Sequence, residues 1–146
     1  MNCIFREAQP TDAADIQRLY LELVQDSNIR VSSESIRAIV NDEFNILVVG
    51  ERSGTVVATA FMTICRDVMY GDQPFAVVEN VVVTQSERGN GIGSALMDWL
   101  KLKAKSLRCT KIMLLSSSKR TEAHSFFERC GYSSELKRGF VNYINR

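Results

Sequence analysis

The chain has 146 residues and a formal net charge of +1, with 45% hydrophobic and 24% charged residues. These values are typical of a globular domain that buries a core of its own, and we expect residues 1–146 to form one domain. No apolar stretch reaches the roughly 18 residues that a membrane-spanning helix needs. The first seven residues also lack the features of a signal peptide, so we expect a cytoplasmic protein without a membrane partner.

The four cysteines are widely spaced and form no Cys-x-x-Cys pair: Cys3, Cys65, Cys109 and Cys130. The single histidine, His124, has no cysteine at metal-ligand spacing. We therefore expect four reduced, mostly buried thiols and no metal site.

The charge is distributed unevenly along the chain. Residues 1–84 contain 6 Lys/Arg and 12 Asp/Glu, whereas residues 85–146 contain 12 Lys/Arg and 5 Asp/Glu. Solvated surfaces that segregate by chance would explain this difference. The functional alternative is a basic half facing an anionic cofactor and an acidic half facing a cationic substrate.

The first part of the chain predicts a strand and two helices. A strand is expected at residues 3–7, and Pro10-Thr11-Asp12 then offers a side-chain oxygen to cap a helix. The apolar residues of this helix recur at helical spacing: Ile16, Leu19, Tyr20 and Leu23. Ser32 or Ser33 would cap the second helix, whose apolar residues are Ile36, Ile39, Val40 and Phe44.

The remaining elements alternate between strands and helices. Residues 45–52 and 55–65 predict a hairpin with a Ser53-Gly54 turn, and residues 75–84 predict the central strand. A helix starts at about Ile92, a short strand covers 111–115, and a helix near Thr121 ends at Gly131. A final strand is expected at 137–144. The order β α α β β β α β α β predicts an α/β fold in which helices flank both faces of a mixed central sheet.

The inward face of the helix that starts at Ile92 is predicted from its apolar spacing. Four residues are expected to point to the core: Ile92, Ala95, Leu96 and Trp99. The polar residues Ser94, Asp98, Lys101 and Lys105 are expected to face outward.

The most informative segment is Arg88-Gly89-Asn90-Gly91-Ile92-Gly93, between the β-like run 77–83 and this helix. A strand, a glycine turn and a helix start bring several backbone N–H groups and the positive end of a helix dipole into one small volume. Glycine allows close approach and positive φ angles. The segment therefore predicts a site for a phosphate or pyrophosphate.

The segment resembles the acetyl-CoA signature of the GNAT superfamily of N-acetyltransferases, Gln/Arg-x-x-Gly-x-Gly/Ala, with Arg88, Gly91 and Gly93 at its fixed positions. A second block, residues 122–132, resembles the later GNAT helix, which usually reads Ala-x-x-Phe-Tyr-x-x-x-Gly-Phe. The opening Phe5-Arg6-Glu7-Ala8-x-Pro10-x-Asp12 also resembles the usual GNAT first strand and helix start. The resemblance spans nearly the whole chain and implies an acetyl-CoA-dependent N-acetyltransferase of the small-molecule type.

The resemblance implies a role for each part of the cofactor site. Backbone N–H groups of the turn would bind the CoA pyrophosphate: Arg88, Gly89, Asn90, Gly91, Ile92, Gly93 and Ser94. Pantetheine would pair with the central strand at Val81, Val82 and Val83, and the N–H of Val81 or Val82 would stabilise the oxyanion of the tetrahedral intermediate. The amine would attack the thioester directly. Glu79 stands where many family members carry a glutamate that acts as the base, often through a water molecule. Strand alternation would place Glu79 on one face with Val81 and Val83.

Two departures from the family pattern affect the later helix. Phe127 stands where the family usually has the tyrosine that protonates the CoA thiolate. Tyr132 or Tyr143 could serve instead, or the thiolate, whose pKa is not far above 8 by analogy with cysteine, could leave unassisted. Arg120 stands where an asparagine often contacts pantetheine, and with Lys119 it would either pair with CoA phosphates or belong to a solvated basic loop. His124 is expected to be a structural or a surface histidine rather than a catalytic base.

Three alternatives compete with this interpretation. A dinucleotide-binding domain would need a third glycine where Ser94 stands and an acidic residue near position 113, and both are missing. A non-catalytic acyl-CoA-binding sensor or partner module would fit the phenylalanine at position 127. Nucleic-acid binding would need exposed aromatics between the basic residues, so no nucleic acid is expected.

The acceptor is expected to be a small-molecule amine. In the family it is bound near the first two helices and the strand edges that face the cofactor, here roughly residues 23–31 and 66–74. Those segments carry Asp26, Asp67, Tyr70 and Asp72, which favour a cationic amine. The sequence does not fix the oligomeric state, but many family members are dimers, so a homodimer is among the expected states.

Overall fold

The structure, a computed structural model, describes residues 2–145. The chain divides into two compact units, the first ending at Leu114 and the second beginning at Leu115. The helices and strands of the first unit are β1 (Ile4–Glu7), α1 (Ala13–Leu23), α2 (Ser33–Val40), β2 (Asn45–Arg52), β3 (Thr55–Cys65), β4 (Phe75–Val83), α3 (Ile92–Ser106) and β5 (Ile112–Leu114). The second unit contains α4 (Thr121–Arg129).

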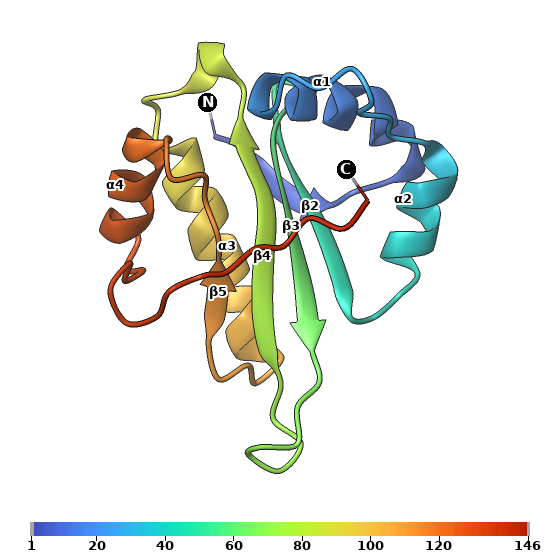
Figure 1. Cartoon of the computed structure of the whole chain (residues 1–146). Helices are drawn as coiled ribbons and strands as arrows, with labels where there is room; N and C mark the ends of the chain where they lie inside the picture. The colour runs from blue at the N-terminus through green and yellow to red at the C-terminus, as the bar shows by residue number, and fades with distance from the viewer. Residues whose placement is uncertain (1, 146) are drawn as a thin grey trace. The chain divides into compact units, whose positions relative to one another are not determined.

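The five strands form one mixed sheet in the order β1-β2-β3-β4-β5 (Figure 1). The first four strands are antiparallel neighbours, and β5 runs parallel to β4. The predicted hairpin is confirmed to the residue, with Ser53 and Gly54 at φ angles of 53° and 79° in the turn between β2 and β3. The predicted mixed sheet of an α/β fold is therefore confirmed.

Helices cover both faces of this sheet: α1 and α2 lie on one face and α3 on the other (Figure 1). On the first face, Ile16 and Leu19 of α1 and Ile36 of α2 pack with side chains from β2, β3 and β4 in one buried cluster. Ser32 is the cap of α2, since its hydroxyl accepts a hydrogen bond of 3.1 Å from the N–H of Ser35. The interiors of β2 and β3 are buried because helices cover both sides.

One predicted inward residue of α3 is exposed. Leu96 is fully buried and Ile92 is 5% exposed, as their spacing predicts, but Ala95 faces solvent. Met97 is buried in addition. The buried stripe of α3 is therefore rotated slightly from the predicted one, and Trp99 is half-buried at its margin.

A β-bulge interrupts β4 in its middle. Glu79 pairs with Phe61 and Val82 pairs with Thr59, so Asn80 and Val81 together face the single residue Ala60. Asn80 has a φ of 58°, a left-handed conformation that asparagine tolerates better than most residues. The predicted alternation along this strand is therefore wrong: Glu79 lies on the same face as Val82, and not with Val81 and Val83.

The second unit contains the predicted helix but not the predicted final strand. The N–H of Tyr132 bonds the carbonyl of Phe127, the N–H of Gly131 bonds that of Glu128, and Gly131 has a φ of 96°. This is the glycine-terminated helix end that the sequence indicates. Within residues 137–144, however, the described chain is irregular and exposed. The alternating apolar residues there favour a strand by propensity, but β-propensity alone does not form one.

Candidate functional site

The glycine turn lies between the end of β4 and the start of α3, as the sequence predicts. Gln85–Glu87 form one turn of 3-10 helix, and Gly91 is the residue before the first turn of α3. The first backbone bond at the start of α3 runs from the N–H of Ala95 to the carbonyl of Gly91. Among residues 2–145, the N–H groups of residues 89–94 have no hydrogen-bond partner. Six donors and the positive end of a 15-residue helix are therefore available to an anion.

Backbone conformation explains two of the glycines. Gly89 and Gly91 have φ angles of 84° and 79°, and a Cβ built on either would meet no other atom within 4 Å. The requirement for glycine thus comes from the left-handed conformation rather than from crowding within the protein. Beside the turn, a hollow of about 510 Å³ is lined by Asn90, Gly91, Ile92, Ala95, Arg52, Asn2 and Cys3.

The second half of β4 has a free edge beside this turn. β5 pairs with β4 only at Ala76, Val77 and Val78. From Glu79 to Val83, β4 is paired with β3 on one side, and no strand of the described chain pairs with its other side. An extended ligand arm could add to this edge as a strand does.

Peptide groups alternate along a strand, so their directions on β4 follow from one hydrogen bond. The N–H of Thr84 donates to the carbonyl of Val57 on β3. The peptide groups of Val82 therefore face β3 as well, whereas those of Val81 and Val83 face the free edge. The carbonyl of Val83 confirms this direction, because it accepts a hydrogen bond of 2.9 Å from the Nε of Arg88.

One ion pair and one hydrogen bond to the backbone fix the first half of the turn. Glu87 accepts a hydrogen bond of 2.6 Å from Arg52 at the end of β2. The Nε of Arg88 donates a hydrogen bond to the carbonyl of Val83, as described above. The second half, residues 89–94, has no such side-chain contacts among the described residues. The turn is therefore held at its start by Glu87 and Arg88 and is open to solvent or a ligand along residues 89–94.

Glu79 is exposed on β4, on the face that α1 covers. It has no ion pair or hydrogen bond within the described chain, in contrast to Glu22 and Glu87. A carboxylate on a central strand that is not used in packing or in a bridge is available to accept a proton.

The second unit carries the other predicted residues. Phe127 and Tyr132 meet edge to face, with ring centroids 6.3 Å apart, and burial raises the pKa of Tyr132 to about 12. Arg120 is exposed before the first turn of α4. His124 Nε2 lies 2.8 Å from the carbonyl of Ser117, so this imidazole links α4 to the preceding loop, consistent with a structural role.

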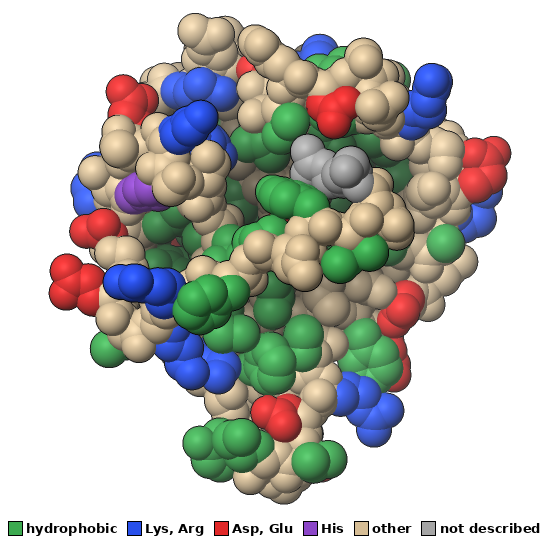
Figure 2. All heavy atoms as spheres, in the orientation of Figure 1, with side chains coloured by type: hydrophobic (Ala, Val, Ile, Leu, Met, Phe, Trp, Pro, Cys, Tyr) green, Lys and Arg blue, Asp and Glu red, His purple; other side chains and the backbone are tan. Residues whose placement is uncertain are grey.

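The acidic residues expected near the acceptor belong to two loops of the first unit. Asp26 accepts a hydrogen bond from the N–H of Asn28, and Asp67 accepts one from the N–H of Met69, so both carboxylates stabilise their own turns. The β3–β4 loop projects beyond the end of the sheet, where apolar side chains gather at its tip (Figure 2). Val68, Met69 and Tyr70 are 90%, 72% and 65% exposed.

Two residues near β4 are missing from the sequence-based prediction. Glu22 on α1 accepts hydrogen bonds from the Thr84 hydroxyl and the Gln85 N–H, at 2.7 and 2.9 Å. Tyr20, also on α1, lies beside the side chain of Asn80 in the bulge, which opposes the rise in the pKa of Tyr20 that burial causes. Both contacts join positions about 60 residues apart, and nothing in the local pattern of either segment indicates them.

All four cysteines are half-buried, and none of them forms a disulfide bond within residues 2–145. No three His, Cys, Asp or Glu side chains gather in a metal-binding group anywhere in residues 2–145. Over the same residues, none of the helices is both long and apolar enough to cross a bilayer.

A mixed sheet with a glycine turn after its bulged, partly free central strand has the architecture of an α/β acetyltransferase. The family model described as "Acetyltransferase (GNAT) family" matches residues 11–132, which include parts of both units. The chain belongs to the GNAT acetyltransferase family.

Known relatives agree with this assignment. The chain is 29% identical over 102 residues to glucosamine 6-phosphate N-acetyltransferase of Arabidopsis thaliana, a match that covers 70% of this chain and 66% of that enzyme. It therefore spans about two thirds of that relative's length.

Solved structures also resemble the whole described fold. A protein of Agrobacterium tumefaciens superimposes with a TM-score of 0.88 at 28% identity, covering 97% of this chain and 99% of that one. An aminoglycoside acetyltransferase from an uncultured soil metagenomic sample superimposes with a TM-score of 0.85 at 15% identity, covering 99% and 97% of the two chains. The second likeness concerns the fold alone.

Proposed function

We propose that this protein transfers an acetyl group from acetyl-CoA to a primary amine of a small molecule. The observation that carries the proposal is the combination of a free edge on β4 with six unpartnered backbone N–H groups directly after it. The first feature suits an extended pantetheine arm and the second suits a pyrophosphate. Their order along the chain matches the order of these groups in CoA.

In this proposal, residues 89–94 hold the pyrophosphate through backbone N–H groups. The expected contribution of the Arg88 N–H is wrong, because this group already donates to the carbonyl of Gln85, at 3.3 Å. The peptide groups of Val81 and Val83 pair with pantetheine, and the N–H of Val81 donates to the thioester carbonyl oxygen as negative charge develops there. Val82 contributes to packing rather than to cofactor binding in this proposal, because its peptide groups face β3 and its side chain belongs to the buried cluster. The direction of the peptide groups therefore favours Val81 over Val82 as the oxyanion donor.

Glu79 is proposed as the general base, directly or through a water molecule. Alkyl amines are mostly protonated at neutral pH, so a proton must leave before the nitrogen can attack. Attack forms the bond from nitrogen to the acetyl carbon, and collapse of the tetrahedral species breaks the bond to the CoA sulfur. Tyr132 is a candidate to protonate the departing thiolate, because a pKa of about 12 keeps its hydroxyl protonated at neutral pH.

The acceptor is proposed to be cationic. The basis is the acidic balance of residues 1–84 and the presence of Asp26, Asp67 and Asp72 in the loops of the first unit. The relative from Arabidopsis thaliana is named for glucosamine 6-phosphate, an amino sugar, and we propose that this chain's own acceptor is also a small-molecule amine. A cytoplasmic location and a homodimer stay predictions.

Calorimetric titration with acetyl-CoA, with NAD as the control ligand, tests the first part of the proposal. We expect saturable binding of acetyl-CoA at micromolar concentrations and none of NAD. Release of free thiol in the presence of a panel of amines then tests catalysis. Binding without turnover on any amine would favour the alternative, a non-catalytic acyl-CoA sensor, for which the phenylalanine at position 127 is the supporting observation. Absence of binding would contradict both.

A further inference from the structure

The last turns of α1 contact β4 at two places that the proposed chemistry does not use. Glu22 accepts hydrogen bonds from the Thr84 hydroxyl and the Gln85 N–H, at 2.7 and 2.9 Å. These two donors are the residues at which β4 ends and the glycine turn begins. A carboxylate that accepts two hydrogen bonds holds its partners more firmly than a neutral acceptor would.

The second contact lies at the bulge. The Tyr20 hydroxyl lies beside the side chain of Asn80, which opposes the rise in the pKa of Tyr20 that burial causes, and the ring of Tyr20 packs against the buried cluster under α1. Asn80 is the left-handed residue directly before Val81. Tyr20 therefore borders the position at which β4 departs from regular strand geometry.

Together the two contacts bracket the free edge of β4. Tyr20 holds the residue before Val81, and Glu22 holds the residue after Val83. The peptide groups that face the free edge lie between these two points, so their direction depends on both. We call Tyr20 and Glu22 the α1 clamp.

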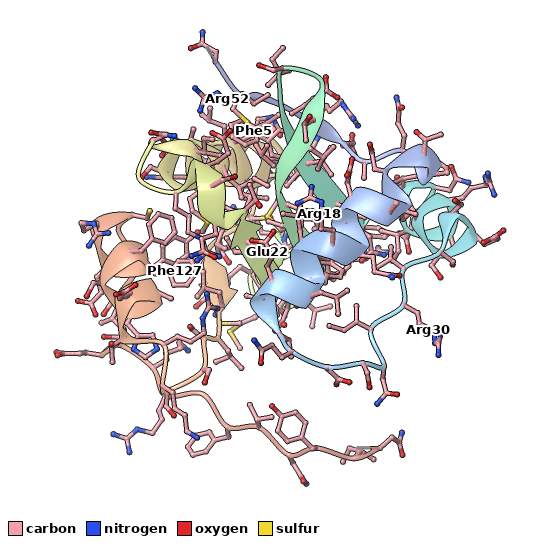
Figure 3. The ribbon with its side chains drawn as sticks, turned by 90° about the horizontal axis from the view of Figure 1, so that it is seen from above. Phe5, Arg18, Glu22, Arg30, Arg52 and Phe127 are labelled. Carbon is pink, nitrogen blue, oxygen red and sulfur yellow. The ribbon has the colours of Figure 1, made fainter. Side chains whose placement is uncertain are left out.

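The surrounding charges explain why a carboxylate can lie so close to an anion site. Arg18, one turn before Glu22 on α1, lies 3.5 Å from the Glu22 carboxylate and also donates to the carbonyl of Val56 on β3, at 2.7 Å (Figure 3). Arg88 acts on the same carboxylate as a nearby positive charge. The negative charge of Glu22 is thus offset locally, and its hydrogen bonds remain as the main effect.

We propose that the α1 clamp positions the catalytic edge of β4, with Tyr20 and Glu22 acting as positioning residues for the N–H of Val81 and for the glycine turn. This inference rests on the proposed function. It assigns different consequences to the two residues. Loss of Glu22 frees the turn that holds the cofactor, whereas loss of the Tyr20 hydroxyl loosens the bulge beside the oxyanion donor.

The experiment measures the dissociation constant for acetyl-CoA by calorimetry, together with kcat and KM, for the full chain and its variants. Glu22→Ala is expected to weaken acetyl-CoA binding about tenfold, because both contacts to the turn are lost. Glu22→Gln keeps one carbonyl acceptor for Gln85 and an amide that can donate to the Thr84 oxygen. Its affinity is expected to stay within about threefold of the wild type.

Tyr20→Phe is expected to lower kcat about 10- to 100-fold with little change in acetyl-CoA affinity, since small displacements of an oxyanion donor are costly. In an Asn80→Gly background, which keeps the left-handed conformation and removes the amide, Tyr20→Phe should cause no further loss. Glu43→Gln, an exposed change in charge before β2, is the matched control and should leave all constants unchanged.

The outcomes separate this inference from the proposed function. If the wild type does not bind acetyl-CoA, the proposed function fails and the clamp fails with it. If the wild type binds and turns over while Glu22→Ala keeps its affinity and Tyr20→Phe keeps its kcat, only the clamp is overturned. A Thr84→Val variant, which removes one Glu22 contact without touching α1, is also expected to weaken binding, and it decides the question if Glu22→Ala does not fold.

Discussion

At the scale of single residues, some carboxylates of this protein have hydrogen-bond partners that hold the fold together, whereas Glu79 has none among the described residues. Asp12, Glu22 and Glu87 accept hydrogen bonds from specific donors, and those bonds hold elements together. Glu79 makes no such contact among the described residues and lies next to the bulge in β4. A carboxylate without a structural task beside a proposed oxyanion donor is the natural candidate for proton transfer.

Glu79→Gln should therefore reduce turnover by about 100-fold or more on an amine that is mostly protonated, because the amide cannot accept the proton. The loss should be largest at low pH and should shrink as the pH approaches the pKa of the amine. A pH–rate profile on one amine, recorded for the wild type, Glu79→Gln and Glu43→Gln, measures this effect. Parallel profiles for the wild type and Glu79→Gln would exclude Glu79 as the base.

Asp12 offers a prediction about stability. Its carboxylate receives two hydrogen bonds from Arg6, at 2.8 and 3.0 Å, and one from the N–H of Gln9, at 2.7 Å, and its side chain is only 8% exposed. The hydrogen bonds from Arg6 lower the pKa of Asp12 from 3.8, against the opposing effect of burial. A depressed pKa in the folded state means that the stabilisation is present above about pH 4 and is lost as the pH falls below it.

Asp12→Asn should lower the free energy of unfolding by about 2–4 kcal/mol at pH 7, since it leaves Arg6 without its main partner. Urea unfolding at pH 7 and at pH 3 measures the difference, which should be smaller at pH 3 because the wild-type carboxyl is then becoming protonated. Asp98→Asn on the exposed face of α3 serves as the control. An equal loss at both pH values would contradict the assigned role of the charge.

At the scale of elements, sequence patterns predict those structures whose causes are local. The β2–β3 hairpin, the Ser32 cap and the glycine end of α4 each depend on a few adjacent residues, and each is confirmed. The bulge at Asn80 and the contacts of Tyr20 and Glu22 depend on strands and helices that meet only after folding. The strand expected at 137–144 is wrong, because the local β-propensity on which it rests does not by itself form a strand.

The glycine turn gives the prediction at this scale. Gly91→Val must force a β-branched residue to a φ of 79°, which costs about 1–2 kcal/mol, and it places two methyl groups beside the free N–H groups. A cost of about 1.4 kcal/mol corresponds to a tenfold change in affinity, so the affinity for acetyl-CoA should fall at least about tenfold. Gly71→Val is the matched control, since Gly71 has a φ of 75° in the loop before β4 and a Cβ there also meets nothing within 4 Å. Calorimetry should show normal acetyl-CoA binding for Gly71→Val.

At the scale of the whole molecule, ligand binding and folding are linked. A ligand that binds only the folded chain at a concentration 100 times its dissociation constant adds about 2.7 kcal/mol to the free energy of unfolding. For a chain of this length, acetyl-CoA should then raise the melting temperature by about 5 °C or more. Thermal unfolding with acetyl-CoA, with NAD and without ligand measures the shift. Equal shifts with both ligands would mean that the site does not select for CoA.

The free edge of β4 has one more consequence, for the protein in the absence of its ligand. Residues 79–83 offer backbone donors and acceptors in an extended valine-rich segment, and such an edge can pair with the same edge of another molecule. A ligand that pairs with this edge would compete with that self-association. Acetyl-CoA would then act as a solubilising agent as well as a substrate, and concentrated protein without it should aggregate more readily in light-scattering measurements.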